Sequence, residues 1–163
     1  DMPRSYFRVQ EPIELEEQGK FVGVYPADNY RITGTIEFDH PLIGLQSCSF
    51  DISEDLFAEQ IGPARTFGFL DEYELLKRFG LARGGSLDNV VVIGEDKVMN
   101  PGGLRFPDEF VRHKILDCIG DFSLIGKPII GHVVVEKSGH AFNHPFLEKF
   151  FAKKDSWETC TLP

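Results

Sequence analysis

Two segments, YRITGTIEFD at residues 30–39 and LQSCSFDI at residues 45–52, alternate apolar residues with polar or small ones. This period of two is typical of half-buried strands. Two similar segments precede them, YFRVQEPIEL at 6–15 and KFVGVYP at 20–26, and Gly, Pro, Asn and Asp separate the four. Four successive strands with short connections favour an antiparallel meander.

Helical patterns and further strands follow these four segments. The helical segments are 53–62, 71–80, a long one opened by Pro107, and 141–154, with a short strand or turn expected at 65–70 and a strand at 127–137. Strands followed by helices predict an α+β fold. We expect one domain, residues 1–163, built as a two-layer sandwich of a mainly antiparallel sheet with helices on one face.

The composition excludes several classes of protein. Of 163 residues, 42% are hydrophobic, which allows a packed core, and 26 acidic against 17 basic residues give a net charge of −9. That charge argues against nucleic acid as a partner. No apolar run approaches the roughly 18 residues that a membrane helix needs. Three scattered cysteines, Cys48, Cys118 and Cys160, form no CxxC pair. The simplest interpretation is a protein of the reducing cytoplasm.

The segment FVRHKILDCIGDF at 110–122 places polar groups in an otherwise apolar helix. His113, Asp117 and Asp121 follow one another at steps of four and therefore form one stripe, with Lys114 beside it. A histidine and a carboxylate at this spacing are suited to binding zinc, although a complete site needs at least one more protein ligand. The alternative is a solvated helix face, where such pairs are common.

The segment KSGHAFN at 137–143 places His140 where a strand gives way to the last helix. A histidine on such a turn can face a cleft and titrates near neutral pH, as acid/base chemistry requires. The alternative is a histidine that helps to cap the helix. His40 and His144 are interpreted as turn residues beside prolines, and His132 as a strand residue. RGGSLDN at 83–89 is a weak phosphate motif, because it lacks the Lys-Ser/Thr of a P-loop.

Together, four motifs resemble the second half of the UDP-3-O-acyl-N-acetylglucosamine deacetylases, which are zinc amidases of lipid A synthesis in Gram-negative bacteria. The motifs are PARTFGFL, LARGGSLDNVVVI, NPGGLRFPDEFVRHKILDCIGD and KSGHAFN. The resemblance covers about residues 5–162. It implies a β-α-β insert at residues 80–106 that forms an apolar passage for the acyl chain.

The resemblance also implies roles for single residues. His113 and Asp117 would be zinc ligands, and Asp121 would hold His140, the cationic group that stabilises the oxyanion or protonates the leaving amine. Lys114 matches a position near the sugar and diphosphate, and Thr66 matches a hydroxyl next to the scissile amide. Phe38 and Glu37 match positions that contact the uridine, and Lys137 and Lys20 match positions that contact the diphosphate. Phe67 and Phe69 are further expected substrate-binding residues.

The sequence departs from the family pattern at Phe142, where Leu is expected and only packing should change, and in a second respect that concerns the metal site. The first half of the family supplies the remaining zinc histidine and a water-activating glutamate in a Glu-His pair, and this chain has no Glu-His dipeptide. We therefore expect an isolated second half whose partner is the missing first half, inactive on the UDP-3-O-acyl-glucosamine substrate alone. The alternatives are a non-catalytic binding module for a nucleotide sugar or acyl chain, and an α+β interaction domain whose polar stripe is solvated.

Overall fold

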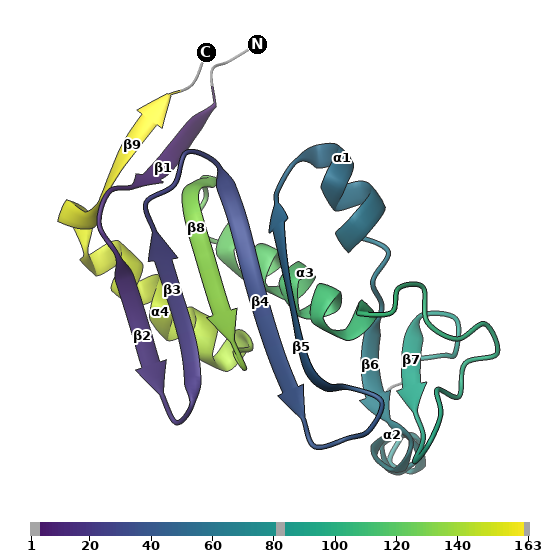
Figure 1. Ribbon diagram of the computed structural model, residues 1–163. Helices are drawn as coiled ribbons and strands as arrows, with labels where there is room; N and C mark the ends of the chain where they lie inside the picture. Colours follow the sequence, from purple (N-terminus) through teal and green to yellow (C-terminus); the bar gives the residue numbers. More distant parts are fainter. Residues whose placement is uncertain (1–3, 81–83, 162–163) are drawn as a thin grey trace.

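The computed structural model describes residues 4–80 and 84–161 (Figure 1). Its main feature is a seven-stranded sheet whose pairings are mostly antiparallel. The strands are β1 (Ser5–Val9), β2 (Ile13–Glu17), β3 (Lys20–Tyr25), β4 (Tyr30–Phe38), β5 (Gly44–Asp51), β8 (Ile129–Glu136) and β9 (Trp157–Thr161).

The strand β8 lies in the middle of this sheet. It pairs antiparallel with β3 and parallel with β4, so that Val133 lies opposite Val24 on one side and Ile32 on the other. β1 joins the start of β8 in parallel, and β9 pairs with β1. The predicted meander is therefore wrong: β2–β3 and β4–β5 are hairpins, but β8 separates them. Within this sheet β8 is the longest strand of mainly apolar residues that pairs on both edges, with β3 on one side and β4 on the other.

The sequence segment predicted as one strand at 6–15 forms two. β1 and β2 are separated around Pro12, whose nitrogen has no hydrogen to donate to a ladder. The helical segment at 53–62 forms a short α1 (Glu54–Leu56), capped by Ser53, that continues as a π-helix (Phe57–Ile61).

Two helices cover one face of the sheet, α3 (Glu109–Ser123) and α4 (His140–Ala152) (Figure 1). The N-cap of α3 is Asp108, so Pro107 precedes the helix rather than opening it. The predicted two-layer α+β fold is thus confirmed. No helix within residues 4–80 and 84–161 is both long and apolar enough to cross a membrane.

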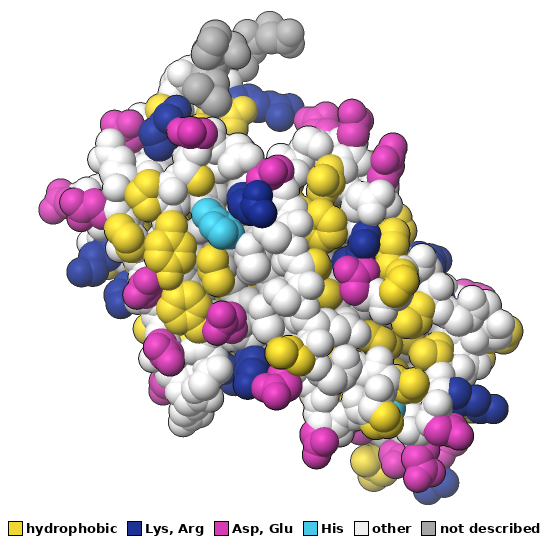
Figure 2. All heavy atoms as spheres, in the orientation of Figure 1, with side chains coloured by type: hydrophobic (Ala, Val, Ile, Leu, Met, Phe, Trp, Pro, Cys, Tyr) yellow, Lys and Arg dark blue, Asp and Glu magenta, His cyan; other side chains and the backbone are white. Residues whose placement is uncertain are grey.

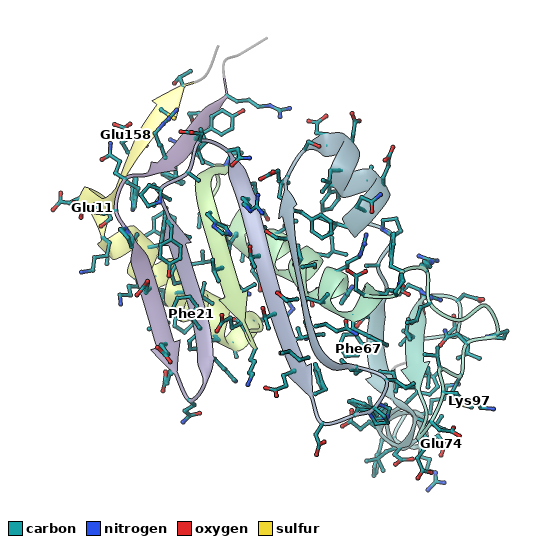
Figure 3. All side chains as sticks on the ribbon, in the orientation of Figure 1. Glu11, Phe21, Phe67, Glu74, Lys97 and Glu158 are labelled. Atoms are coloured by element: carbon teal, nitrogen blue, oxygen red, sulfur yellow. The ribbon has the colours of Figure 1, made fainter. Side chains whose placement is uncertain are left out.

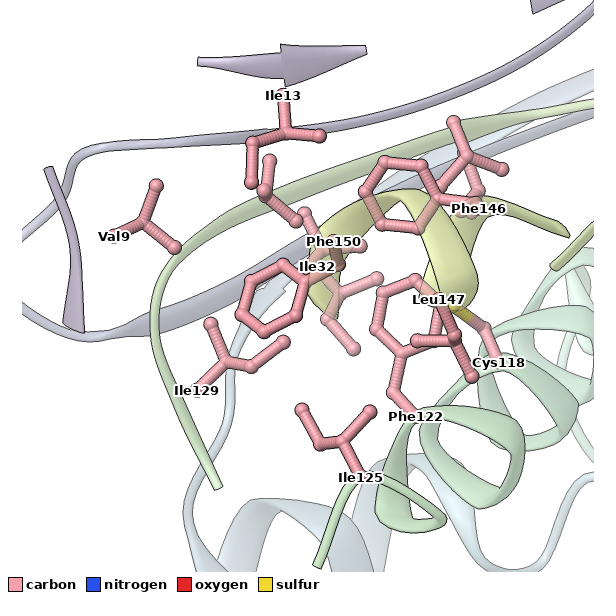
Figure 4. Packing of buried hydrophobic residues seen from close by; sticks show 14 of the residues in the cluster. Val9, Ile13, Ile32, Cys118, Phe122, Ile125, Ile129, Phe146, Leu147 and Phe150 are labelled. Atoms are coloured by element: carbon pink, nitrogen blue, oxygen red, sulfur yellow. The ribbon is translucent and has the colours of Figure 1, made fainter. Parts of the chain in front are cut away.

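The main core fills the space between the sheet and these helices (Figure 4). Ile32 on β4, Phe122 on α3 and Phe146 on α4 are at most 3% exposed. Burying a side chain of this size stabilises the fold by about 1.5–3 kcal/mol. α3 approaches β4 so closely that a Cβ at Gly34 would lie 2.8 Å from Cγ1 of Ile115, so only glycine fits there without a shift.

A smaller unit packs beside the β4–β5 hairpin. β6 (Thr66–Phe69), α2 (Leu70–Arg78) and β7 (Val90–Ile93) form a parallel β-α-β unit. The predicted insert at 80–106 overlaps this unit only in β7, and residues 81–83 lie outside the described part, so the bounds of the insert stay a prediction. A second buried cluster, which includes Ile36, Val91 and Phe110, attaches the unit to β4 and α3.

The face of the sheet opposite α3 and α4 carries few charges in its middle (Figure 2). Thr33 bonds Ser49 at 2.7 Å and His132 at 2.8 Å, which confirms His132 as a strand residue. Burial, together with the nearby charge of Arg31, lowers the pKa of His132, so its neutral form is favoured. The ionisable stripe expected from the sequence lies on the other side, on α3.

Candidate active site

The helix α3 brings His113 and Asp117 together. His113 Nε2 lies 3.4 Å from Asp117 Oδ1, and the two side chains are 16% and 31% exposed. The expected four-residue spacing therefore gives two donor atoms aimed at one place.

A second contact fixes the proton on His113. Its Nδ1 lies 3.0 Å from the carbonyl oxygen of Ala64, which can only accept, so Nδ1 carries the hydrogen. Nε2 then holds the lone pair, as a metal-binding histidine requires. Among the residues that the structure describes, no group of three or more His, Cys, Asp or Glu side chains is placed to hold one metal ion. The chain thus offers two ligands that fit zinc, short of the usual number.

A second histidine–carboxylate pair joins α4 to α3. His140 Nδ1 lies 2.6 and 2.7 Å from the two carboxylate oxygens of Asp121, whose side chain is 9% exposed, whereas that of His140 is 66% exposed. Asn143 donates to Asp121 at 2.9 Å, and Ser138 donates to Asn143 at 2.5 Å. This chain of bonds holds the imidazole with its Nε2 directed away from Asp121.

His144 is a neighbour of this pair that the sequence interpretation missed. It lies in α4 rather than in a turn, and its Nε2 is 3.9 Å from Asp121 Oδ1. The available signal was its distance of four residues from His140, which puts both on one face of a helix.

One member of each pair, Asp117 of the first and His140 of the second, lines a common pocket of about 140 Å³. Lys114, Asp117 and His140 line it, and Gly34 and Val135 are part of its sheet wall. A cation from Lys114, the carboxylate of Asp117 and the imidazole of His140 thus converge on a space that fits a small polar group.

The residues predicted for the diphosphate lie at one end of the sheet. Lys137 follows β8 and pairs with Glu37 of β4. The register of β3 against β8, with Phe21 opposite Glu136, places the exposed Lys20 next to Lys137. Lys137 has a φ of 52°, an uncommon backbone angle for a residue with a side chain, and such strain tends to occur at functional sites.

The predicted aromatic positions form one cluster between the β4–β5 hairpin and α3. Phe67, labelled in Figure 3, packs edge-on against Phe38, with ring centroids 5.6 Å apart, and against Phe110 at 5.0 Å. Phe69 lies 6.2 Å from Phe38. Lys114 Nζ lies 5.7 Å from the centre of the Phe67 ring, and the exposed Thr66 begins β6. Part of the Phe38 surface predicted to stack on uracil is therefore used in packing.

Part of the segment predicted to form the acyl passage, residues 93–96, lines a hollow of mixed character. A hollow of about 1140 Å³ lies beside the end of β7, where apolar Phe69 and Ile93 meet acidic residues. The acidic lining residues are Asp71, Glu72, Glu95 and Asp96.

Glu109 has a larger role than the sequence indicated. As an acid in the first turn it suits the positive end of α3, but it is also fully buried and paired with Arg65, whose Nε lies 2.9 Å from Oε1. Burial alone would raise the pKa of Glu109, but bonds from Arg65 and from the Arg105 N–H outweigh it and hold the pKa below its usual value. The bond to Glu109 raises the pKa of Arg65.

An α+β domain with a metal-type His–Asp pair beside a second His–Asp pair has the groups of a metal-assisted hydrolase. The chain belongs to the UDP-3-O-acyl N-acetylglycosamine deacetylase family, whose model matches residues 1–152. The resemblance inferred from the motifs is confirmed.

Curated relatives support this assignment. Proteins named UDP-3-O-acyl-N-acetylglucosamine deacetylase are 53% identical over 155 residues in Syntrophotalea carbinolica and 47% over 158 residues in Myxococcus xanthus, covering 95% and 97% of this chain. A third, from Oleidesulfovibrio alaskensis, is 54% identical over 145 residues and covers 89%. The chain spans about half the length of these relatives, 50%, 50% and 48% respectively.

Proposed function

We propose that this chain is the second half of a zinc-dependent enzyme that deacetylates UDP-3-O-acyl-N-acetylglucosamine, a cytoplasmic step of lipid A biosynthesis. Family membership and the half-length match support the proposal. The observation that carries it is the convergence of Lys114, Asp117 and His140 on one pocket, with His113 beside Asp117.

In this proposal His113 and Asp117 are two of the zinc ligands. His113 offers Nε2 because Ala64 fixes the hydrogen on Nδ1, and Asp117 offers Oδ1. When bound, zinc supplies positive charge that polarises the amide carbonyl and makes water more acidic. The half of the relatives' length that this chain does not span supplies the remaining protein ligand and the general base.

His140 handles the proton at the leaving nitrogen. Hydrolysis breaks the amide C–N bond, adds water across it and leaves an amine that must gain a proton. In this proposal His140 Nε2 gives that proton, because the bonds from Nδ1 to Asp121 leave Nε2 on the far side of the ring and His140 lines the pocket. Lys114 and Thr66 orient the substrate at the same pocket and stabilise the negative charge that develops on the carbonyl oxygen.

The remaining predicted positions bind the rest of the substrate. Lys20 and Lys137 lie at the sheet end where the diphosphate is placed, beside Glu37 and Phe38 for the uridine. Phe67, Phe69 and the segment 80–106 contact the acyl chain.

The test compares this chain alone with the same chain joined to the remaining half of a relative's length. We expect no amide hydrolysis from the chain alone, and zinc-dependent hydrolysis from the joined protein, because the chain has two ligands and no water-activating Glu-His pair. Release of the free amine from the acylated UDP-sugar is the measurement. Zinc-dependent turnover by the chain alone would show that the base lies within it.

A non-catalytic module for nucleotide sugars or acyl chains would use the same lysines and aromatic residues. It predicts that the joined protein binds the UDP-sugar without consuming it, and that metal removal leaves this binding unchanged. The same assay therefore separates the two functions.

A further inference from the structure

One peptide group is bonded from both sides by α3. The carbonyl of the peptide between Ala64 and Arg65 accepts from His113 Nδ1 at 3.0 Å, and its N–H, on Arg65, donates to Glu109 Oε1 at 3.0 Å. Glu109 and His113 are one helical turn apart, so one face of α3 bonds both polar ends of this peptide.

The carboxylate of Glu109, at the end of this series of hydrogen bonds, is held in place by several groups. Glu109 is 0% exposed, and Oε2 accepts from the Arg105 N–H at 2.8 Å and from Arg65 Nη2 at 3.1 Å. Arg65 Nη2 also donates to Gly103 O at 2.9 Å. A buried, immobile carboxylate of this kind acts on the groups it touches without first reorienting.

This arrangement has an electrostatic consequence for His113. A carboxylate that accepts the peptide N–H polarises the peptide, and hydrogen bonds in such a chain strengthen one another. The Ala64 oxygen becomes a stronger acceptor for the His113 Nδ1 hydrogen, which makes Nε2 a better electron-pair donor. Metal-binding histidines are commonly tuned in this way by a carboxylate or a carbonyl; here the two act in series.

We propose that Glu109 is a positioning residue for the metal site: through the 64–65 peptide it fixes the tautomer of His113 and strengthens Nε2 as a ligand. The inference rests on the proposed function only in that it takes His113 to bind zinc. The bonds from α3 to this peptide also hold the start of β6, and with it Thr66, beside α3.

The test uses two substitutions that both break the Glu109–Arg65 ion pair. Glu109→Gln keeps the shape but removes the charge from the 64–65 peptide. Arg65→Met removes the guanidinium but leaves the backbone N–H bonded to the carboxylate. Asp108→Asn is the matched control, because it breaks the Arg112–Asp108 pair, 2.6 Å long, in the same turn of α3 without touching this peptide.

Two readouts are measured at pH 8. One is the tautomer of His113 in the zinc-free 163-residue chain, from long-range nitrogen–hydrogen NMR correlations. The other is zinc affinity in the joined protein, by competition with a chelator. We expect an Nδ1–H tautomer in the wild type, a larger Nε2–H fraction in Glu109→Gln, and about a tenfold loss of zinc affinity in Glu109→Gln. Arg65→Met should be less stable yet keep most of the zinc affinity. Asp108→Asn should keep both the wild-type tautomer of His113 and the wild-type zinc affinity.

An Nε2–H tautomer in the wild type overturns the inference. So does an equal loss of affinity in Glu109→Gln and Arg65→Met, because affinity would then follow the ion pair rather than the charge on the peptide. If the wild-type joined protein binds no zinc, the proposed function fails, and the tautomers of the wild type and Glu109→Gln alone decide whether Glu109 acts on His113.

Discussion

The two histidine–carboxylate pairs of α3 differ in how completely each carboxylate is used. Asp117 is about one-third exposed and 3.4 Å from His113, whereas Asp121 is 9% exposed and accepts from both His140 and Asn143. In the first pair, His113–Asp117, the carboxylate keeps lone pairs that a ligand could use, and we call it the open pair. In the second, His140–Asp121, the carboxylate accepts from protein groups on both oxygens, and we call it the closed pair. A carboxylate that is open suits ligand binding, and one that is saturated suits holding another side chain.

The largest expected effect separates the pairs by function. In the joined protein, His140→Ala should lower the deacetylation rate about 10²- to 10⁴-fold, the usual contribution of a general acid or base, with zinc content unchanged. Asp117→Ala should instead lose zinc. Rates and metal content measured on the same samples check this. His132→Ala, on the opposite face of the sheet, serves as control, and loss of zinc in His140→Ala would contradict the division of roles.

A second change should disturb the open pair through the packing beneath it. Gly34→Ala places a Cβ 2.8 Å from Cγ1 of Ile115, which lies between His113 and Asp117 on α3, so the Ile115 side chain or the helix must shift. We expect a loss of about 1–3 kcal/mol in the free energy of unfolding. Urea denaturation measures it. Gly68→Ala is matched, because nothing lies within 4 Å of a Cβ there, and it should cost far less.

The open pair was predictable from sequence, and the closed pair was not predictable from spacing. Helical periodicity alone brings His113 to Asp117, since both are on one helix. His140 meets Asp121 only because β8 and α4 return the chain to α3, and only the family resemblance paired them. The central place of β8 was missed for the same reason: strand order depends on contacts between distant segments. Glu109 gave no local signal either, because Arg65 lies 44 residues earlier.

The stability that Glu109, a third carboxylate of α3, contributes should depend on pH. The folded-state pKa of Glu109 is lowered, so the unfolded chain binds the proton more readily as pH falls. The stability from Glu109 is therefore complete above its unfolded pKa of about 4.3 and is lost as pH falls through the lower folded value. Urea unfolding of wild type and Glu109→Gln should differ at pH 7 and converge in acid. A difference that does not shrink would mean that Glu109 stabilises by packing alone.

The smallest change in the free energy of unfolding should come from a substitution at Asp117. Asp117→Ala removes a partly exposed partner of His113, and such pairs contribute less than about 1 kcal/mol, so urea unfolding of the metal-free chain should change little. Asp121→Ala should cost about 1–3 kcal/mol, because it leaves the buried Asn143 without an acceptor. If Asp117→Ala destabilises the chain as much as Asp121→Ala, then Asp117 is needed for folding, and the pair is not an open one waiting for a ligand.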